Sequence, residues 1–430
     1  MGKKAVAAKK AKPGMQKNTN GASLLRAARE LSYVEQGSSE LTRDINRDLI
    51  LQYIRNLQPV TRAELARISR LQPSTVSSIV EQLKVERWVC EGNTTKTARG
   101  RRPTPLTLNS DLLILVGDVR PNWAVLAVVD LNGRFLSRST VALPSNVKRS
   151  VAAIAEGMLQ LRAQFPDKTF EGAGLSVPGR VHPTTNRVIL APNLNWKDYD
   201  ISGELTRLLG LRVELENDAN ACLLSELWFG RLRGLRNVVL VAISEGVGTA
   251  ILAEGRLIGG REGLAGEFGH VCVDRSGPLC SCGQHGCWEM YASSRAALRY
   301  YDEQRLDSGK LTMAELITRA LNRDQQAIEA LERQCREIGA GIRTINAALS
   351  PEAILFAGDI TNFWNIGASI IREECEAGLL TGSRPRLHSI GDGELALLRG
   401  AAAVVLQRHT GYYRSAHNQP KNGTQAATAI

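Results

Sequence analysis

Residues 266–287 read GEFGHVCVDRSGPLCSCGQHGC, the most specific local pattern in the chain. One histidine and three cysteines stand here at the spacing H-x9-C-x-C-x4-C, namely His270, Cys280, Cys282 and Cys287. Zn²⁺ prefers thiolates and imidazole in a closed tetrahedral shell, and the intervening glycines allow a tight loop to bring four ligands together. The stretch therefore predicts one structural zinc ion, the alternative being unrelated cysteines in a glycine-rich loop.

On both sides of this loop the chain alternates between strand and helix patterns. Strand patterns cover 112–117, 123–130, 134–141 and 172–177, and a helix pattern covers about 149–164. A similar alternation starts again at 238–252. Alternating elements of this kind indicate an α/β domain. Because the pattern occurs twice, we expect two α/β lobes, together spanning residues 109–410.

Residues 39–108 predict a separate, mainly helical domain. Apolar residues at a spacing of four, from Leu41 to Leu57, predict its first helix. Thr61 with Glu64 three residues later forms a capping-box pattern that opens a second helix. Pro73 suits the first position of a third helix, and two short strand patterns follow it. This order of elements predicts a winged helix-turn-helix domain.

The third helix separates apolar from polar positions. Its apolar face consists of Val76, Ile79, Val80 and Leu83. Short polar side chains at the start of such a helix can approach base edges and phosphates in the major groove, and a basic wing tip can enter the minor groove. The predicted DNA contacts are Gln72, Ser74, Thr75, Ser77 and Ser78 on the helix and Arg101 and Arg102 at the wing. The alternative is an ordinary three-helix bundle with solvent-facing hydroxyls.

Composition agrees with a globular DNA-binding protein. The chain has 54 Lys and Arg against 43 Asp and Glu, a formal net charge of +11, which favours a polyanionic partner. No apolar run approaches the roughly 20 residues of a membrane span, and no signal core follows the first lysines. We therefore expect a cytoplasmic protein, associated with the nucleoid when bound to DNA. Residues 1–38 predict a flexible basic arm, and 411–430 a polar tail.

Four motifs of the second domain together resemble the ROK family: GLSVPG at 174–179, ENDAN at 216–220, GVGT at 246–249 and GEFGH at 266–270. The resemblance implies the two-lobed actin/hexokinase-like fold. That family contains both sugar kinases and sugar-responsive repressors, so membership alone leaves the activity open. The helix-turn-helix in front of the lobes resembles the repressor branch.

The same resemblance implies a sugar pocket. Asn217 and Asp218 would lie at the reactive hydroxyl, Glu267 and Glu289 would accept from other ring hydroxyls, and His270 would both hold zinc and face the sugar. Gly179 and Asn195 are further candidates, with turn structure as the alternative role. Carboxylates and amides suit this task because each can bind two neighbouring hydroxyls.

The loops that would hold ATP depart from the family's kinases. Those kinases carry an Asp-x-Gly-Gly-Thr turn in the first hairpin, where residues 117–123 here read GDVRPNW. Arg120 and Pro121 put side chains where backbone should approach phosphate, and Pro121 has no N–H. Glu245 in the second loop would repel phosphate. We therefore expect no catalytic residue, with Asp218 as the vestigial base position.

The sequence thus predicts a non-enzymatic DNA-binding regulator, a repressor of carbohydrate uptake or catabolism genes that responds to a sugar or sugar derivative. The expected partners are a double-stranded DNA operator, a small-molecule sugar effector and further copies of the chain in a homodimer or tetramer. Two alternatives stay open. One is an active ROK kinase that phosphorylates a hexose or N-acetylhexosamine with ATP, and the other is a DNA-bound scaffold that senses a protein partner.

Overall fold

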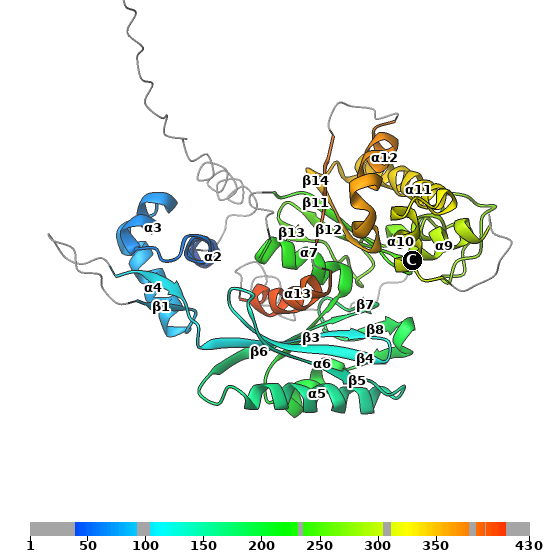
Figure 1. Ribbon diagram of the computed structural model, residues 1–430. Coiled ribbons are helices and arrows are strands. Elements are labelled where there is room, and N and C mark those ends of the chain that lie inside the picture. The colour runs from blue at the N-terminus through cyan, green and yellow to red at the C-terminus, as the bar shows by residue number, and fades with distance from the viewer. Residues whose placement is uncertain are drawn as a thin grey trace, which may run out of the picture.

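A computed structural model describes residues 39–92, 104–230, 235–303, 311–377, 384–391 and 393–409. Figure 1 shows a small helical domain beside two larger lobes. The predicted arm, the polar tail and the wing tip with Arg101 and Arg102 lie outside the described residues. Within those residues, no helix is both long and apolar enough to cross a membrane.

The small domain has the element order of a winged helix. Its elements are α2 (Ser39–Leu57), α3 (Arg62–Ser69), α4 (Pro73–Val85), β1 (Val89–Glu91) and β2 (Leu106–Leu108). The capping box that opens α3 is confirmed, since Thr61 accepts from the N–H of Glu64 and the Glu64 carboxylate accepts from the N–H of Thr61. Pro73 occupies the first turn of α4 as predicted. The antiparallel pair β1 and β2 forms the base of the wing.

The predicted apolar face of α4 is confirmed, and that of α2 is confirmed in its middle: Ile45 is half-buried, and the side chain of Leu41 lies outside the described residues. All four apolar residues of α4 are buried, as are Leu49 and Tyr53 of α2. Leu57, in contrast, is 47% exposed. A spacing of four residues advances about 40° beyond one full turn at each step, so the predicted stripe rotates out of the core toward the end of the helix.

The first lobe is built on a five-stranded sheet in the order β10-β6-β3-β4-β5. Its strands are β3 (Leu112–Arg120), β4 (Trp123–Asp130), β5 (Phe135–Ala142), β6 (Thr169–Val177) and β10 (Val213–Asn217). The helices α5 (Val147–Ala163) and α6 (Ile201–Leu209) pack on one face. A small sheet of β7 (Arg180–Val181), β8 (Val188–Ala191) and β9 (Trp196–Tyr199), with the 3₁₀ turn η2 (Pro192–Leu194), follows β6.

The second lobe repeats this arrangement with a sheet in the order β13-β12-β11-β14-β15. Its strands are β11 (Val238–Ile243), β12 (Val247–Ala253), β13 (Arg256–Leu257), β14 (Ala353–Gly358) and β15 (Arg386–Ser389). One face packs on α8 (Glu289–Ala292), α9 (Ser294–Asp302), α10 (Met313–Leu321), α11 (Gln325–Leu349), α12 (Trp364–Glu376) and the turn η4 (Asp359–Phe363). The turn η3 (Phe268–His270) precedes the cysteine-rich loop.

The two sheets have the same strand order and the same parallel and antiparallel pairings. In each, the first, fourth and fifth strands run parallel and the second and third complete a meander. The predicted repeat of α/β lobes is therefore confirmed. The carboxyl ends of parallel strands are where such sheets bind ligands, so these ends define the region in which to look for a site.

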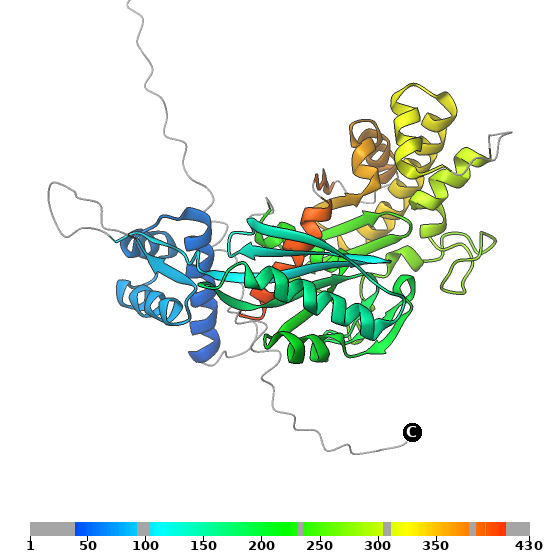
Figure 2. The same cartoon turned by 60° about the horizontal axis from the view of Figure 1, so that its bottom comes forward.

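Two helices, α7 (Asp218–Trp228) and α13 (Gly393–Gln407), lie between the sheets (Figure 1). They cross closely, because a side chain on Gly400 would lie only 2.0 Å from the carbonyl oxygen of Ala221. The apolar face of α13 joins β3, β4 and the core of the winged helix in one continuous cluster of buried side chains. Figure 2 shows the winged helix at one end of the molecule and the helices of the second lobe at the other.

Candidate functional site

The first part of the site is the start of α7, where the chain leaves β10. Asn217 caps the helix, with its side-chain oxygen accepting from the N–H groups of Ala219 and Asn220 at 2.9 and 3.4 Å. The Asn217 amide also donates to the carbonyl of Gly179 at 2.7 Å. The predicted ligand residue Asn217 therefore holds the helix end and the loop after β6 together. The carboxyl group of Asp218 follows in the first turn of the helix.

The Asp218 carboxyl group has an unusual environment. Burial raises its pKa, and the negative charge of Glu267 raises it further, against hydrogen bonds from backbone N–H groups. A carboxyl group in such a position is costly to keep ionised in the folded chain. The interaction between the Glu267 and Asp218 carboxylates is therefore a repulsion between like charges.

Gly179 and Asn195 occupy turns beside this helix end. Gly179 has φ of +119°, and a side chain there would lie 2.4 Å from the carbonyl oxygen of Leu190, so the position requires glycine. Asn195 ends the turn η2 with φ of +56° and is exposed. The turn roles considered for both residues are thus present. The contact from Asn217 to Gly179 joins Gly179 to the site.

The GEFGH segment of the second lobe lies against β12 and presents two polar side chains. Gly266 has φ of +93°, and its carbonyl accepts from the hydroxyl of Thr249. A side chain on Gly269 would lie 2.2 Å from the carbonyl oxygen of Val247. These close approaches fix the backbone on either side of Glu267 and next to His270. The imidazole Nε2 of His270 lies 3.9 Å from the Glu267 carboxylate.

The other face of His270 meets the three cysteines. The ligand atoms of His270, Cys280, Cys282 and Cys287 all lie within 4.8 Å of one another. The Cys280 Sγ is 3.5 Å from His270 Nδ1, and Cys282 Sγ is 3.5 Å from Cys287 Sγ. Tetrahedral Zn²⁺ with these donors needs separations of about 3.3 to 3.8 Å. The two pairs at 3.5 Å have this separation and the remaining ligand atoms lie within 4.8 Å, so the predicted ligands are brought together as a group that could hold a metal.

The glycines of the loop allow this arrangement. Gly286 has φ of +67°, and a side chain there would lie 1.5 Å from the carbonyl oxygen of Asp274. Burial raises the pKa of the Cys287 thiol to about 12 and that of Cys280 as well, whereas the N–H of Gln284 lowers the pKa of Cys282. A metal ion binds thiolates, so it would have to displace protons from the buried pair.

Glu289 connects the cysteine loop to the cleft. It is 6% exposed, and its carboxylate accepts from the Cys280 thiol at 3.0 Å and lies 3.8 Å from His270 Nδ1. Its second oxygen faces Gly246 of the loop after β11, where a side chain would approach within 2.9 Å. Glu267, His270 and Glu289 therefore form a chain of neighbouring polar groups, and the charge of Glu267 acts on Asp218. No described contact adds Asn195 to this chain.

The first hairpin, which the sequence predicts to differ from that of the family's kinases, carries an ion pair. Pro121 and Asn122 form a two-residue turn with φ of +71° at Asn122. The Arg120 guanidinium donates to the buried Asp118 carboxylate at 2.6 Å. The sequence had suggested the steric effect of Arg120 but not this pairing, because nothing in the order of residues shows which way the arginine turns.

A second polar surface lies on the winged helix. Gln72, Ser74 and Ser78 are exposed, and Thr75 and Ser77 are half-exposed. The Gln72 side chain makes no capping hydrogen bond, so it does not stabilise the start of α4. Thr42, Arg43 and Asn46 of α2 join Ser74, Thr75 and Ser78 in an open groove. Sequence reasoning missed these three residues of α2, since polar positions on an outer helix face carry no distinguishing pattern.

Comparison with known proteins agrees with this architecture. The family model described as "ROK family" matches residues 122–408. The chain is 30% identical over 368 residues to the xylose repressor of Bacillus subtilis, covering 84% of this chain and 95% of that protein. It is 30% identical over 306 residues to the glucokinase of Streptomyces coelicolor, covering 67% of this chain and 96% of the enzyme.

Solved structures give the same result. A ROK family transcriptional regulator, described as a homologue of the Escherichia coli MLC protein, superposes with a TM-score of 0.75 and 24% identity, over 87% of this chain and 98% of the other. This likeness concerns the fold, including a regulator's full length rather than the lobes alone. The motifs, the duplicated lobes and the matched family model lead to one conclusion: the chain belongs to the ROK family.

Proposed function

We propose that this protein is a sugar-responsive transcriptional repressor that regulates carbohydrate uptake or catabolism genes. The observation that carries the proposal is the presence, in one molecule, of a winged helix with exposed polar side chains on α4 and of a group of carboxyl side chains around the imidazole of His270. The repressor relative from Bacillus subtilis supports it by aligning with 84% of the chain. Such a repressor acts in the cytoplasm, on the nucleoid.

The sugar site comprises Asp218, Asn217, Glu267, His270 and Glu289, with Gly179 and Asn195 at its edge. Carboxylates accept from ring hydroxyls, and the free N–H of the Asn217 amide can donate. The names of the xylose repressor and the glucokinase make D-xylose the first effector to test, followed by D-glucose. The N-acetylglucosamine repressor of Escherichia coli, 26% identical over 339 residues, adds N-acetyl-D-glucosamine.

Zinc is the metal that His270, Cys280, Cys282 and Cys287 fit, and its role is structural. A closed shell of four protein ligands leaves no position for substrate. When bound, the ion would fix the imidazole ring, which directs Nε2 toward Glu267 and the sugar side. Glu289 lies beside both Cys280 and His270, so a metal held by these two residues would also fix the surroundings of its carboxylate.

The DNA surface comprises Gln72, Ser74, Thr75, Ser77 and Ser78, together with Arg101 and Arg102 of the wing. A homodimer or tetramer would place two such surfaces on a palindromic operator. Sugar binding would favour a more closed arrangement of the lobes and so change the spacing of the paired winged helices.

The alternative is an active ROK sugar kinase, and the similarity to the glucokinase of Streptomyces coelicolor supports it. The Arg120–Asp118 pair argues against it, because the arginine stands at the turn where kinases present glycine amides to phosphate. The experiment is to measure operator binding by the full chain with and without each sugar, alongside ATP turnover. Sugar-dependent DNA affinity without turnover supports the repressor, whereas enzyme-like phosphorylation of any of these sugars contradicts it.

A further inference from the structure

The helix α7 has one end at the proposed sugar site and the other at the winged helix. It begins with the cap Asn217 and with Asp218, and it ends at Trp228. Its 11 residues span about 16 Å. One rigid element therefore reaches from the pocket to the DNA-binding domain.

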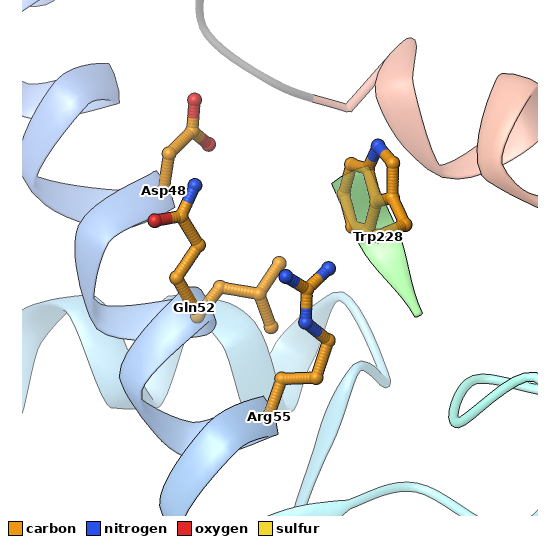
Figure 3. A pocket seen from close by; sticks show the side chains of 5 residues that line it. Asp48, Gln52, Arg55 and Trp228 are labelled. Carbon is orange, nitrogen blue, oxygen red and sulfur yellow. The ribbon is translucent and has the colours of Figure 1, made fainter. Parts of the chain in front are cut away.

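The far end of α7 meets α2 through one aromatic contact. The guanidinium of Arg55 lies over the Trp228 ring, 4.7 Å from its centroid. Figure 3 shows Arg55 reaching from α2 toward Trp228, with Asp48 and Gln52 on the same helix. Both side chains are only half-exposed. A partly desolvated cation on an indole ring is the strong form of this interaction.

A turn of the first lobe braces the same junction. The ring of Phe229, the next residue after α7, packs on Gly133, where a side chain would lie 2.7 Å from the ring. Asn132 in that turn accepts from the Gln58 amide at 2.7 Å, just beyond the end of α2. The carbonyl of Gly133 also accepts from Arg399 of α13 at 3.3 Å. A shift of the end of α7 would therefore also displace α2.

The middle of α7 leaves it little freedom to bend. Gly400 of α13 approaches the Ala221 backbone so closely that no side chain fits between the helices. Ala219, Cys222 and Leu223 are buried against the second sheet. A displacement at Asp218 is thus passed along the helix as a rigid shift, one of the established forms of conformational switching.

We infer that Arg55 and Trp228 are positioning residues that transmit sugar occupancy to the winged helix. This inference rests on the proposed function, because it supplies the route by which that function's two surfaces communicate. A sugar that contacts Asp218 and Asn217 moves the start of α7, and the Arg55–Trp228 contact converts the shift into a new orientation of α2. By thermodynamic linkage, the factor by which the sugar changes operator affinity equals the factor by which the operator changes sugar affinity.

The test measures coupling rather than binding. A duplex is first selected from a randomised library by the full-length protein, and its affinity is measured by fluorescence anisotropy with and without D-xylose, D-glucose or N-acetyl-D-glucosamine. For wild type we expect one sugar to change operator affinity by about 5- to 150-fold. Trp228→Ala and Arg55→Ala should each reduce that ratio to about 2 or less, while the sugar Kd from calorimetry changes less than about twofold. Trp228→Phe, which keeps a ring, should retain most of the coupling.

The matched control is Arg333→Ala, which removes an arginine stacked on Tyr300 in the second lobe, 3.8 Å from the ring centroid. It should leave the coupling ratio unchanged. A double-mutant cycle of Arg55→Ala and Trp228→Ala should show that the second substitution adds nothing once the first is made. Full coupling in both alanine variants overturns this inference alone. If none of the three sugars changes the operator affinity of the wild-type protein, the proposed function is overturned, and the inference with it.

Discussion

At the residue scale, Asp218 shows how a ligand site and fold stability compete. Burial and the nearby charge of Glu267 raise its pKa, so the ionised form is disfavoured in the folded chain. The energetic penalty is present above the folded pKa and absent below the ordinary carboxyl range. A carboxyl group whose ionisation lowers the stability of the fold is a candidate for a functional role, because stability alone does not explain its presence.

Asp218→Asn is expected to raise the melting temperature at pH 7.5, with the gain shrinking as the pH falls toward 4. The same change should weaken sugar binding at least about tenfold, since it removes a charged acceptor. Differential scanning fluorimetry with and without sugar measures both effects. Glu245→Gln, an exposed carboxylate in the loop after β11, serves as the control and should give no pH-dependent gain. A melting temperature lowered at neutral pH would contradict the electrostatic account.

Cys282→Ser is expected to abolish metal binding, because one of the four ligands is lost from a closed shell. Mass spectrometry of the metal content should find about one zinc per wild-type chain and almost none in the variant. Cys272→Ser is the matched control: that exposed thiol is not among the four clustered ligands, and the variant should stay loaded. Full zinc content in Cys282→Ser would refute the ligand assignment.

At the scale of elements, the start of α4 carries the proposed DNA contacts. Ser78→Ala removes one hydroxyl from the exposed face and should weaken operator binding about fivefold, the effect of one hydrogen bond of about 1 kcal/mol. Val85→Ala changes a side chain that is 83% exposed at the other end of the helix and should have no effect. Anisotropy titrations at one fixed salt concentration compare the two. Equal operator affinities for Ser78→Ala and wild type would mean that Ser78 does not contact the operator.

Local chemistry explains which elements could be predicted from sequence. The Thr61 and Glu64 cap, Pro73 at the start of α4 and the cluster of His270 with three cysteines are all short-range patterns, and the structure has each of them at the predicted residues. The contact between Arg55 and Trp228 could not be predicted, because an arginine on an outer helix face looks like any solvated residue. The exposed end of α2 at Leu57 was misjudged because a four-residue spacing is not the true helical period.

At the scale of the whole molecule, the winged helix and the first lobe share their core. Buried side chains run without a break from α2 and α4 through β2 and β3 to α13. Polar contacts reinforce the boundary: Arg47, 1% exposed, pairs with Glu86 and donates to the carbonyl of His409 at 3.0 Å, and His409 in turn meets Trp88 edge-on. Arg47 and His409 lie 362 residues apart along the chain, so no local sequence pattern could predict their contact.

Arg47→Met should therefore loosen the docking of the winged helix. The Glu86 carboxylate, which would keep its hydrogen bond from Gln82, and the His409 carbonyl would each lose the contact with Arg47, at a cost of about 2 to 4 kcal/mol. Calorimetry should show one cooperative transition for wild type, and a lower or split transition for the variant. Arg43→Met, on the exposed side of the same helix, should match wild type. An unaltered thermogram for Arg47→Met would mean that the junction is held by apolar packing alone.

The continuous apolar cluster has a practical consequence for protein engineering. A biosensor built by grafting a foreign DNA-recognition module onto these lobes would uncover apolar side chains at the end of α13 and on one face of β3, and exposed apolar surfaces promote aggregation. Successful chimaeras would have to transplant the matching faces of α13 and β3 along with the module, or take the exchange point inside the cluster rather than at the connecting residues 109–111.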